Sequence, residues 1–397
     1  MVLIGGWGSL SAQNVGSNYA RQVNTLIGTK GVGLTSGYLY PGATYPYGMV
    51  QFTPSYFSKR SGFVINQLSG GGCEHMGNFP TFPVKGKLKM SPDNILNYRI
   101  NISEEKGHAG YYEAKVQEDI HAKLTVTERT GMASYEYPAD QQYGTVIIGG
   151  GISATPIEQA AIVITAPNKC EGYAEGGNFC GLRTPYKVYF VAEFDTDALE
   201  SGTWKRDELK PNTTFAEGEY SGVYFTFDVN KKKNIQYKIG VSYVSVENAR
   251  ENLKAENTGW DFLQIQNQAE SKWNHYLGKI EVEGTNPDRT TQFYTHLYRS
   301  FIHPNVCSDV NGEYMGADFR VHKSRSKHYT SFSNWDTYRT QIQLLSILDP
   351  EVASDIVISH QLFAEEAGGA FPRWVMANIE TGVMQGDPTP ILISNAY

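Results

Sequence analysis

The chain has 397 residues, a formal net charge of -7, 40% hydrophobic and 19% charged residues. This length exceeds what one hydrophobic core usually holds, so we predict two domains. The acidic balance, with no basic cluster beyond the lysine run at residues 231–233, argues against a nucleic-acid partner, and no apolar stretch is long enough to span a membrane. The oligomeric state is left open.

The first residues predict export. Residues 1–13 are similar to the end of a secretory signal peptide, and Ser11-Ala12 before Gln13 is a plausible cleavage site. We therefore assign residues 1–22 to a residual leader segment. The expected location is periplasmic or extracellular.

Residues 23–246 predict an antiparallel β-sandwich. Segments rich in β-branched and aromatic residues recur at short intervals, at residues 111–116, 122–128, 186–194 and 223–229. Glycine-rich turns separate them, and helical periodicity is missing. Short strands that follow one another in this way are typical of a sandwich rather than of alternating strands and helices.

Cysteine spacing predicts one disulfide within this region. Cys170 and Cys180 bracket a polar, glycine-containing segment that we interpret as a loop, and an oxidising compartment would let them pair. A metal site is disfavoured because no histidine or second cysteine pair stands nearby at ligand spacing. The alternative is that Cys73, Cys170, Cys180 and Cys307 are four separate buried thiols.

The hydrophobic period changes after residue 246. Residues 247–277 predict helix with a break near Gly259, and residues 279–282 predict a short strand. We interpret residues 247–286 as a helical linker that contains this strand. Asn286 followed by proline predicts the N-terminus of the next helix.

Residues 287–397 predict successive helices joined by short links. We expect them at about residues 288–303, 335–348 and 350–367, with another opening near Pro388. The sequence ends inside an apolar helical pattern without a capping glycine. We therefore expect the chain to be the N-terminal part of a longer protein, truncated within its second domain.

Asp336 is the most suggestive polar residue of the helical part. It falls in the first turn of a predicted helix after Ser333 or Asn334, next to Trp335. A carboxylate at a helix N-terminus stays ionised, and beside an aromatic ring it suits the binding of sugar hydroxyls. The alternative is that Asp336 only caps its own helix.

Several segments, taken together in order and spacing, resemble glycoside hydrolase family 92, the calcium-dependent exo-α-mannosidases. They are Val-Asn-Thr-Leu-Ile-Gly-Thr at residues 23–29, Tyr-Pro-Gly-Ala-Thr-Tyr-Pro-Tyr-Gly-Met-Val-Gln at 40–51, Leu-Ser-Gly-Gly-Gly-Cys at 68–73, Phe-Ile-His-Pro-Asn at 301–305, Ser-Asp-Val-Asn-Gly at 308–312 and Phe-Ser-Asn-Trp-Asp-Thr-Tyr-Arg at 332–339. The resemblance implies a β-sandwich domain followed by an all-α toroid, a barrel of paired helices that carries the active site.

The resemblance also implies substrate-binding residues. Trp335 and Asp336 match the family's Trp-Asp pair, whose aspartate holds hydroxyls of the terminal mannose, and Asp387 matches a second contact to that sugar. An N-cap is the alternative role for Asp387, because a proline follows it.

The glycine-rich loop at residues 68–73 is expected to reach into the pocket. Two histidines that are common in the family before this loop are replaced here by Ile65 and Gln67. Glu74 and His75 either compensate for them or pair with each other on the surface. Gln67, Glu74 and His75 therefore complete the predicted sugar-binding set.

The implied activity is hydrolysis of terminal α-linked mannose, with α-1,2 linkages preferred, from mannose-containing glycans with inversion and with the help of Ca²⁺. The general acid, the general base and most calcium ligands are expected beyond Tyr397, so no catalytic residue is assigned and the metal ligands stay unknown. Glu365 and Glu366, at a helix end, are interpreted as surface residues. Two alternatives remain: a non-catalytic carbohydrate-binding module, and another glycosidase or phosphorylase with a sandwich-plus-toroid architecture.

Overall fold

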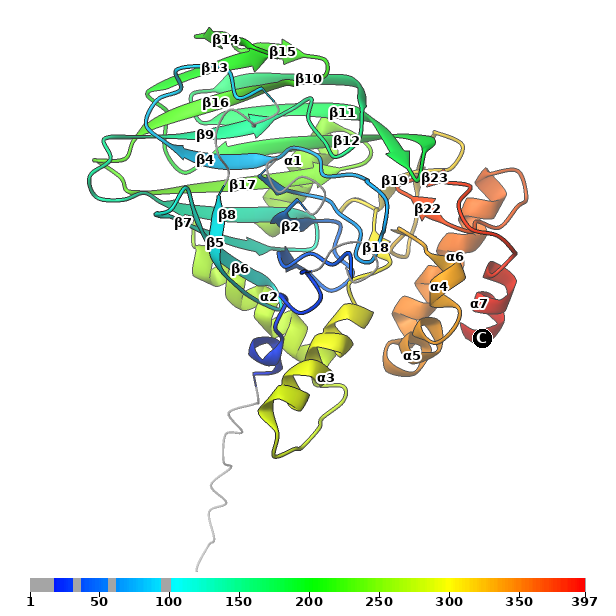
Figure 1. The fold of residues 1–397 in the computed structure, drawn as a ribbon. Helices are drawn as coiled ribbons and strands as arrows, with labels where there is room; N and C mark the ends of the chain where they lie inside the picture. Colours follow the sequence, from blue (N-terminus) through cyan, green and yellow to red (C-terminus); the bar gives the residue numbers. More distant parts are fainter. Residues whose placement is uncertain (1–17, 31–36, 56–61, 94–100, 397) are drawn as a thin grey trace, which may run out of the picture.

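The computed structural model describes residues 18–30, 37–55, 62–93 and 101–396. A large body of strands lies at one side, and most of the helices gather at the other side near the C-terminus (Figure 1). The predicted leader falls outside the described residues, except for residues 18–22, which include the short 3-10 helix η1 (Tyr19–Gln22). No helix among the described residues has the length and apolar character needed to cross a bilayer.

Two antiparallel sheets form the body of strands. The first runs in spatial order β1 (Ala43–Thr44), β2 (Gln51–Pro54), β3 (Phe63–Val64), β4 (Thr81–Lys85), β9 (Tyr143–Gly149), β16 (Ser221–Asp228), β13 (Glu200–Lys205) and β14 (Glu208–Pro211). The second runs β15 (Phe215–Glu217), β10 (Ile157–Ala166), β11 (Lys169–Phe179), β12 (Leu182–Phe194), β17 (Asn234–Ser242), β8 (Thr130–Glu136), β7 (Ile120–Val126), β6 (Tyr111–Val116) and β5 (Ile102–His108).

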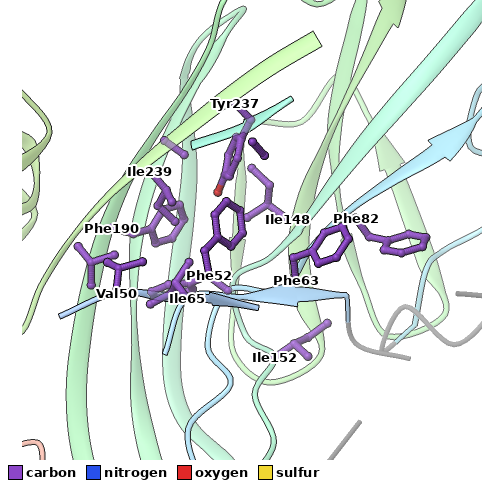
Figure 2. Packing of buried hydrophobic residues seen from close by; sticks show 14 of the residues in the cluster. Val50, Phe52, Phe63, Ile65, Phe82, Ile148, Ile152, Phe190, Tyr237 and Ile239 are labelled. Carbon is purple, nitrogen blue, oxygen red and sulfur yellow. The ribbon is translucent and has the colours of Figure 1, made fainter. Parts of the chain in front are cut away.

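The two sheets bury a common aromatic and aliphatic core (Figure 2). Phe52, Phe63 and Phe82 enter it from the first sheet, and Phe190 and Tyr237 enter it from the second; all five are fully buried. Truncating one such phenylalanine to alanine costs about 3–5 kcal/mol in a packed core. The strand pattern in the sequence therefore predicted the sandwich correctly.

The predicted bridge between Cys170 and Cys180 is wrong. The segment between them is strand β11, whose residues are alternately buried and half-buried, and not a loop. An extended strand of that length holds its ends on the order of 30 Å apart, whereas a disulfide needs Cα atoms within about 7 Å. Cys180 instead pairs with Cys73, with Cα atoms 5.2 Å apart, and Cys170 and Cys307 are buried free thiols.

Helices begin where the sandwich ends. Strand β17 ends at Ser242, and α1 (Val246–Glu256) and α2 (Phe262–Leu277) follow, with a break at the predicted place. Helix α1 packs closely on β17, since a Cβ atom on Gly240 would lie only 2.4 Å from the Ala249 carbonyl oxygen.

The strand expected at residues 279–282 does not form. The N–H groups of Lys279 and Ile280 donate to carbonyls at the end of α2, and Val282 N–H donates to the phenol of Tyr294. These contacts satisfy the backbone without a neighbouring strand. Helix α3 (Pro287–Ser300) then begins after its N-cap Asn286, as predicted.

Three two-stranded sheets and four helices follow α3 among the described residues. The sheets are β18 (Asn305–Val306) with β21 (Tyr329–Thr330), β19 (Glu313–Met315) with β20 (Val321–Lys323), and β22 (Val375–Met376) with β23 (Ile379–Glu380). The helices are α4 (Asn334–Thr337), α5 (Gln341–Leu348), α6 (Pro350–Glu366) and α7 (Thr389–Ala396).

The single helix expected at residues 335–348 is two helices. Helix α4 ends at Thr337, and α5 starts at Gln341. The Gln341 amide donates to the carbonyls of Ser300 and His303, each at 2.9 Å, so the start of α5 is tied to the chain that follows α3. Tertiary contacts of this kind override local helical periodicity.

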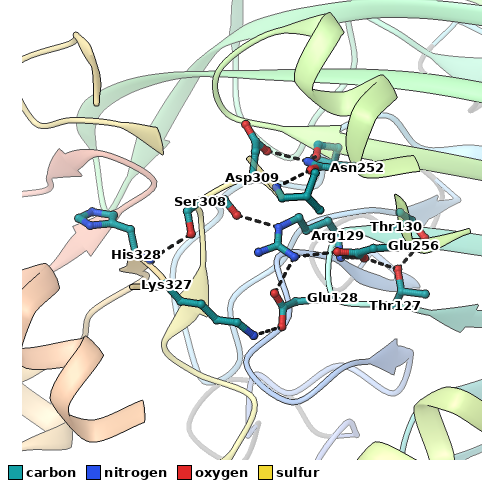
Figure 3. Close-up of polar contacts among 12 residues, drawn as sticks. Thr127, Glu128, Arg129, Thr130, Asn252, Glu256, Ser308, Asp309, Lys327 and His328 are labelled. Atoms are coloured by element: carbon teal, nitrogen blue, oxygen red, sulfur yellow. Dashed lines mark hydrogen bonds and ion pairs between the residues drawn. The ribbon is translucent and has the colours of Figure 1, made fainter. Parts of the chain in front are cut away.

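The sandwich and the helical part meet at Arg129, in the turn between β7 and β8 (Figure 3). The Arg129 guanidinium lies 2.7 Å from both Glu128 and Glu256, and it donates to the Ser308 carbonyl at 2.8 Å. Glu256 ends α1 and Ser308 precedes the β19–β20 hairpin. One buried cation therefore joins the sandwich, the linker helix and the start of the helical part.

We predict that Arg129→Met lowers the free energy of unfolding by about 3–5 kcal/mol, because the largely buried Glu256 loses its ion-pair partner and Glu128 keeps only Lys327. Urea denaturation of the purified protein measures this change. Arg183→Met is the matched control, since Arg183 pairs with Glu158 in a far more exposed position, with 68% of its side chain accessible. Equal effects of the two substitutions would contradict the assignment of Arg129 as the junction.

Candidate active site

A cavity of about 510 Å³ lies where loops of the sandwich meet the helical part, and its size is typical of small-ligand sites. The sandwich supplies residues 68–73 and the tip of the β11–β12 hairpin, Phe179 and Cys180. The helical part supplies Arg299, His303, Pro304, Ser331, Phe332, Ser333, Asn334, Asp336, Thr337, Gln341, Ile342, Leu345, Ile356, His360, Trp374, Val383, Met384 and Leu392. The cavity is therefore composite.

The glycine-rich loop at residues 68–73 forms one wall, where the sequence places it. Gly70 has a positive φ of 82°, which favours glycine, and its N–H donates to the Tyr38 carbonyl at 2.8 Å. A Cβ atom on Gly71 would approach the His75 ring to 2.9 Å, so glycine is needed for this close contact. The Cys73–Cys180 disulfide joins the loop to the β11–β12 hairpin.

Two histidines contact this loop, the buried His75 and the half-buried His303. His75 Nε2 lies 2.9 Å from the Leu68 nitrogen, and His303 Nε2 lies 2.8 Å from the Ser69 nitrogen. Burial lowers the pKa of each imidazole to about 4. Both rings are therefore neutral near pH 7 and can accept hydrogen bonds.

Asp336 lies at the cavity on the four-residue helix α4. The Ser333 hydroxyl donates to its carboxylate, and the Asp336 side chain is exposed. Because an ionised carboxylate accepts up to four hydrogen bonds, it retains capacity to bind hydroxyl groups. Among the described lining residues, Asp336 is the one carboxylate.

Hydrogen bonds and a ring stack hold the helix that carries Asp336. The Asn334 amide donates to the Pro372 carbonyl at 3.0 Å and to the Thr389 hydroxyl at 2.7 Å. The His360 ring stacks on Phe332 at 3.9 Å, and burial lowers its pKa to about 4. These contacts fix the chain immediately before Asp336.

Trp374 is an aromatic residue of the cavity lining. Its ring lies 4.4 Å from that of Phe179 at the tip of the β11–β12 hairpin. The sandwich and the helical part are therefore in contact here as well as at Arg129. The Glu380 carboxylate accepts from the Arg373 and Trp374 N–H groups, which fixes the backbone of this part of the lining. An aromatic face near a carboxylate suits the binding of a sugar ring.

The other predicted site residues lie off the cavity lining. Trp335 is half-buried with its ring 4.5 Å from the Arg339 guanidinium, and Gln67 is buried next to Gln51. Glu74 and Asp387 are exposed. His75 is buried and accepts a hydrogen bond from the Leu68 N–H of the loop. The alternative of a surface pairing between His75 and Glu74 is therefore not formed.

Sequence reasoning did not select His303 and His360, which both line the cavity. His303 stands inside the segment at residues 301–305 that carries part of the family resemblance, and that motif was the available signal. His360 lies within helix α6 without any local polar motif, so only the tertiary structure identifies it.

The described cavity lining does not fit a calcium ion by itself. Ca²⁺ takes six to eight oxygen ligands, and Asp336 is the one carboxylate there, already in contact with Ser333. Away from the cavity, Asp318, His322 and Glu366 bring ligand atoms within 4.8 Å of one another. His322 and Asp318 are hydrogen-bonded to each other, and the Glu366 carboxylate accepts from the Tyr314 hydroxyl and the Ala317 N–H. This mixed nitrogen and oxygen set is not one that calcium prefers.

Sequence profiles identify both parts of the chain. Residues 22–242 match the glycosyl hydrolase family 92 N-terminal domain, and residues 248–397 match the glycosyl hydrolase family 92 catalytic domain. The chain belongs to glycosyl hydrolase family 92. The family resemblance of the individual motifs is thereby confirmed, and the cavity lies where the two family 92 domains meet.

Solved family 92 enzymes share the fold. The structure matches the family GH92 α-mannosidase BT3965 of Bacteroides thetaiotaomicron with a TM-score of 0.84 and 25% identity, over 94% of this chain and 53% of that one. It matches the GH92 inverting mannosidase BT2199 of the same organism with a TM-score of 0.82 and 25% identity, over 95% and 52% of the two chains.

A curated relative, described as an uncharacterized secreted glycosidase of Arthroderma benhamiae, is 26% identical over 363 residues, which cover 81% of this chain and 45% of that protein. The chain therefore spans about half the length of the relatives that it matches.

We predict that acid destabilises the fold in a window set by three histidines at or behind the cavity wall, His75, His303 and His360. Burial lowers the pKa of His75, His303 and His360 from 6.5 to about 4, so the unfolded chain binds more protons than the folded chain between these values. Stability is then full above about pH 6.5 and falls as the pH drops towards about 4.

Thermal denaturation at pH 7.0, 6.0, 5.0 and 4.5 tests this window. His303→Gln removes one such group and should make the decline shallower, whereas the same change at the exposed His296 should leave it unaltered. A constant melting temperature across the series would contradict the prediction.

Proposed function

We propose that this chain is part of an exo-acting α-mannosidase that removes terminal mannose from glycans. The observation that supports it most is the position of Asp336, an exposed carboxylate at a cavity bounded by Trp374 and the glycine-rich loop. Carboxylates and aromatic faces are the groups that bind sugar rings. Family membership and the likeness to two solved mannosidases support the same substrate class.

Hydrolysis of a glycoside normally requires two carboxyl groups, one as acid and one as base or nucleophile. The described cavity lining contributes Asp336 alone, which we assign to substrate binding. We propose that the acid and the base lie in the part of the relatives' length that this chain does not span. Residues 1–397 by themselves should then bind mannosides without hydrolysing them.

The finer features of the proposal are inversion, α-1,2 preference, Ca²⁺ dependence and export. Inversion accords with the name of one solved relative, an inverting mannosidase, and export accords with the curated relative described as secreted. The calcium ligands are proposed to lie mostly outside the described residues, because the described lining offers too few oxygen atoms for the ion.

The product of the complete gene is expected to release mannose from α-1,2-linked mannobiose and to lose this activity in EDTA. Added Ca²⁺ should restore it, because the metal is proposed to help bind the terminal sugar. Mannose release, followed by chromatography, measures both effects. Undiminished turnover in EDTA would remove calcium from the proposal, and turnover by residues 1–397 alone would show that the acid and base lie within this chain.

Asp336→Asn distinguishes a sugar-binding carboxylate from a local structural one. The amide keeps one acceptor oxygen but loses the charge, and charge-assisted hydrogen bonds contribute about 1.5–3 kcal/mol. We expect kcat/KM of the complete protein to fall about tenfold to a hundredfold with little change in melting temperature.

Asp288→Asn is the matched control for this substitution. Asp288 is also in the first turn of a helix, α3, but it is exposed and lies off the described cavity lining. Activity of Asp336→Asn as high as that of the control would assign Asp336 a structural role only.

A further inference from the structure

The glycine-rich loop is fixed at successive backbone positions. Three of its N–H groups donate to acceptors outside the run of glycines, namely His75 Nε2 for Leu68 (2.9 Å), His303 Nε2 for Ser69 (2.8 Å) and the Tyr38 carbonyl for Gly70 (2.8 Å). His75 and Tyr38 belong to the same half of the chain as the loop. Of these three acceptors, His303 alone comes from the catalytic domain, 234 residues further along.

The contacts of Asn305 determine which nitrogen of His303 carries the proton. The Asn305 amide nitrogen donates to the carbonyls of Gly48 and Ile302, each at 2.9 Å, so its oxygen is turned towards His303 Nδ1 at 2.7 Å. Because that oxygen can only accept, Nδ1 is protonated. His303 Nε2 is then left with a free electron pair directed at the Ser69 N–H.

We propose that His303 is a positioning residue that holds the glycine-rich loop of the N-terminal domain against the catalytic domain at the sugar pocket. The assignment of the pocket to mannose rests on the proposed function, whereas the positioning itself rests on these contacts. The ring is half-buried between the two domains and lines the cavity, so a shift of Ser69 would move the cavity wall directly.

The chemistry of this contact requires neutral imidazole. A proton on Nε2 would set two N–H groups against each other, and the neighbouring Arg299 and His75 oppose a further positive charge. Burial, the largest cause, lowers the pKa of His303 to about 4, so the accepting form prevails at neutral pH. Glutamine can supply an accepting oxygen at a similar reach, and leucine cannot.

Hydrogen exchange in the product of the complete gene tests the proposal. His303→Leu removes the acceptor and should speed amide exchange in the peptide that contains residues 68–73 by about tenfold, as expected for the loss of one hydrogen bond. His303→Gln should restore slow exchange. His296→Leu, the same substitution at an exposed position of α3, should leave this peptide unchanged.

Kinetics give a second readout. A displaced wall weakens binding of substrate and transition state together, so His303→Leu should raise KM for an α-mannoside about tenfold with a smaller change in kcat, and His303→Gln should recover most of the loss. If His303→Leu does not fold, Ser69→Pro removes the donor instead of the acceptor and should raise exchange at the neighbouring loop amides.

Unchanged loop exchange in His303→Leu, or a glutamine variant as impaired as the leucine variant, would overturn the proposal, since the accepting nitrogen would then have no special role. The wild-type protein separates this outcome from failure of the proposed function. If the wild type hydrolyses no mannoside but the exchange pattern holds, the mannosidase assignment fails and the positioning role of His303 stands.

Discussion

The structure depends on one buried cation, Arg129. Its guanidinium pairs with Glu128 of the sandwich and Glu256 at the end of α1, and it bonds the Ser308 carbonyl of the catalytic domain. Desolvating three charged groups is expensive unless every one of them is paired. This junction therefore favours a relative position of the domains in which these partners meet, and the His303–Ser69 and Trp374–Phe179 contacts support the same position. The walls of the cavity come from both domains, so the shape of the cavity follows from that position.

The two walls of this composite cavity are held in place in different ways. The catalytic domain holds Asp336 on a short helix supported by Asn334 and the Phe332–His360 stack. In the loop of the N-terminal domain, Gly70, Gly71 and Gly72 have no side chains to pack, so buried Leu68, the Cys73–Cys180 disulfide and accepted N–H groups fix the loop. Glycine lets the backbone approach a ligand closely. Because glycine restricts the backbone least, contacts from neighbouring residues must fix the conformation of such a loop.

Period and turn patterns predicted much of the fold. The alternating segments of the sandwich and the helices α1, α2, α3 and α6 lie close to where the sequence places them. The errors share a cause, which is tertiary context. Glycines at residues 172, 176 and 177 suggested a loop, but they occur in β11 because neighbouring strands leave no room for a side chain, with a Cβ atom at Gly172 only 2.2 Å from the Ala161 carbonyl oxygen.

The site was predicted in part. Asp336 and the glycine-rich loop lie at the cavity, since short motifs carry their identity, whereas Trp335, Gln67 and Glu74 lie off its described lining. The disulfide partner of Cys180 and the role of His303 depend on contacts between residues more than a hundred positions apart. A sequence pattern read in windows of a few residues has no information about such pairs.

A crystal structure of the complete protein with a bound mannose-like inhibitor tests the central claim most directly. The account predicts that the sugar ring lies in the cavity lined by Trp374 and residues 68–73, with a hydroxyl within hydrogen-bonding distance of the Asp336 carboxylate. A ring bound elsewhere, or bound in the cavity with Asp336 turned away from it, would contradict the account.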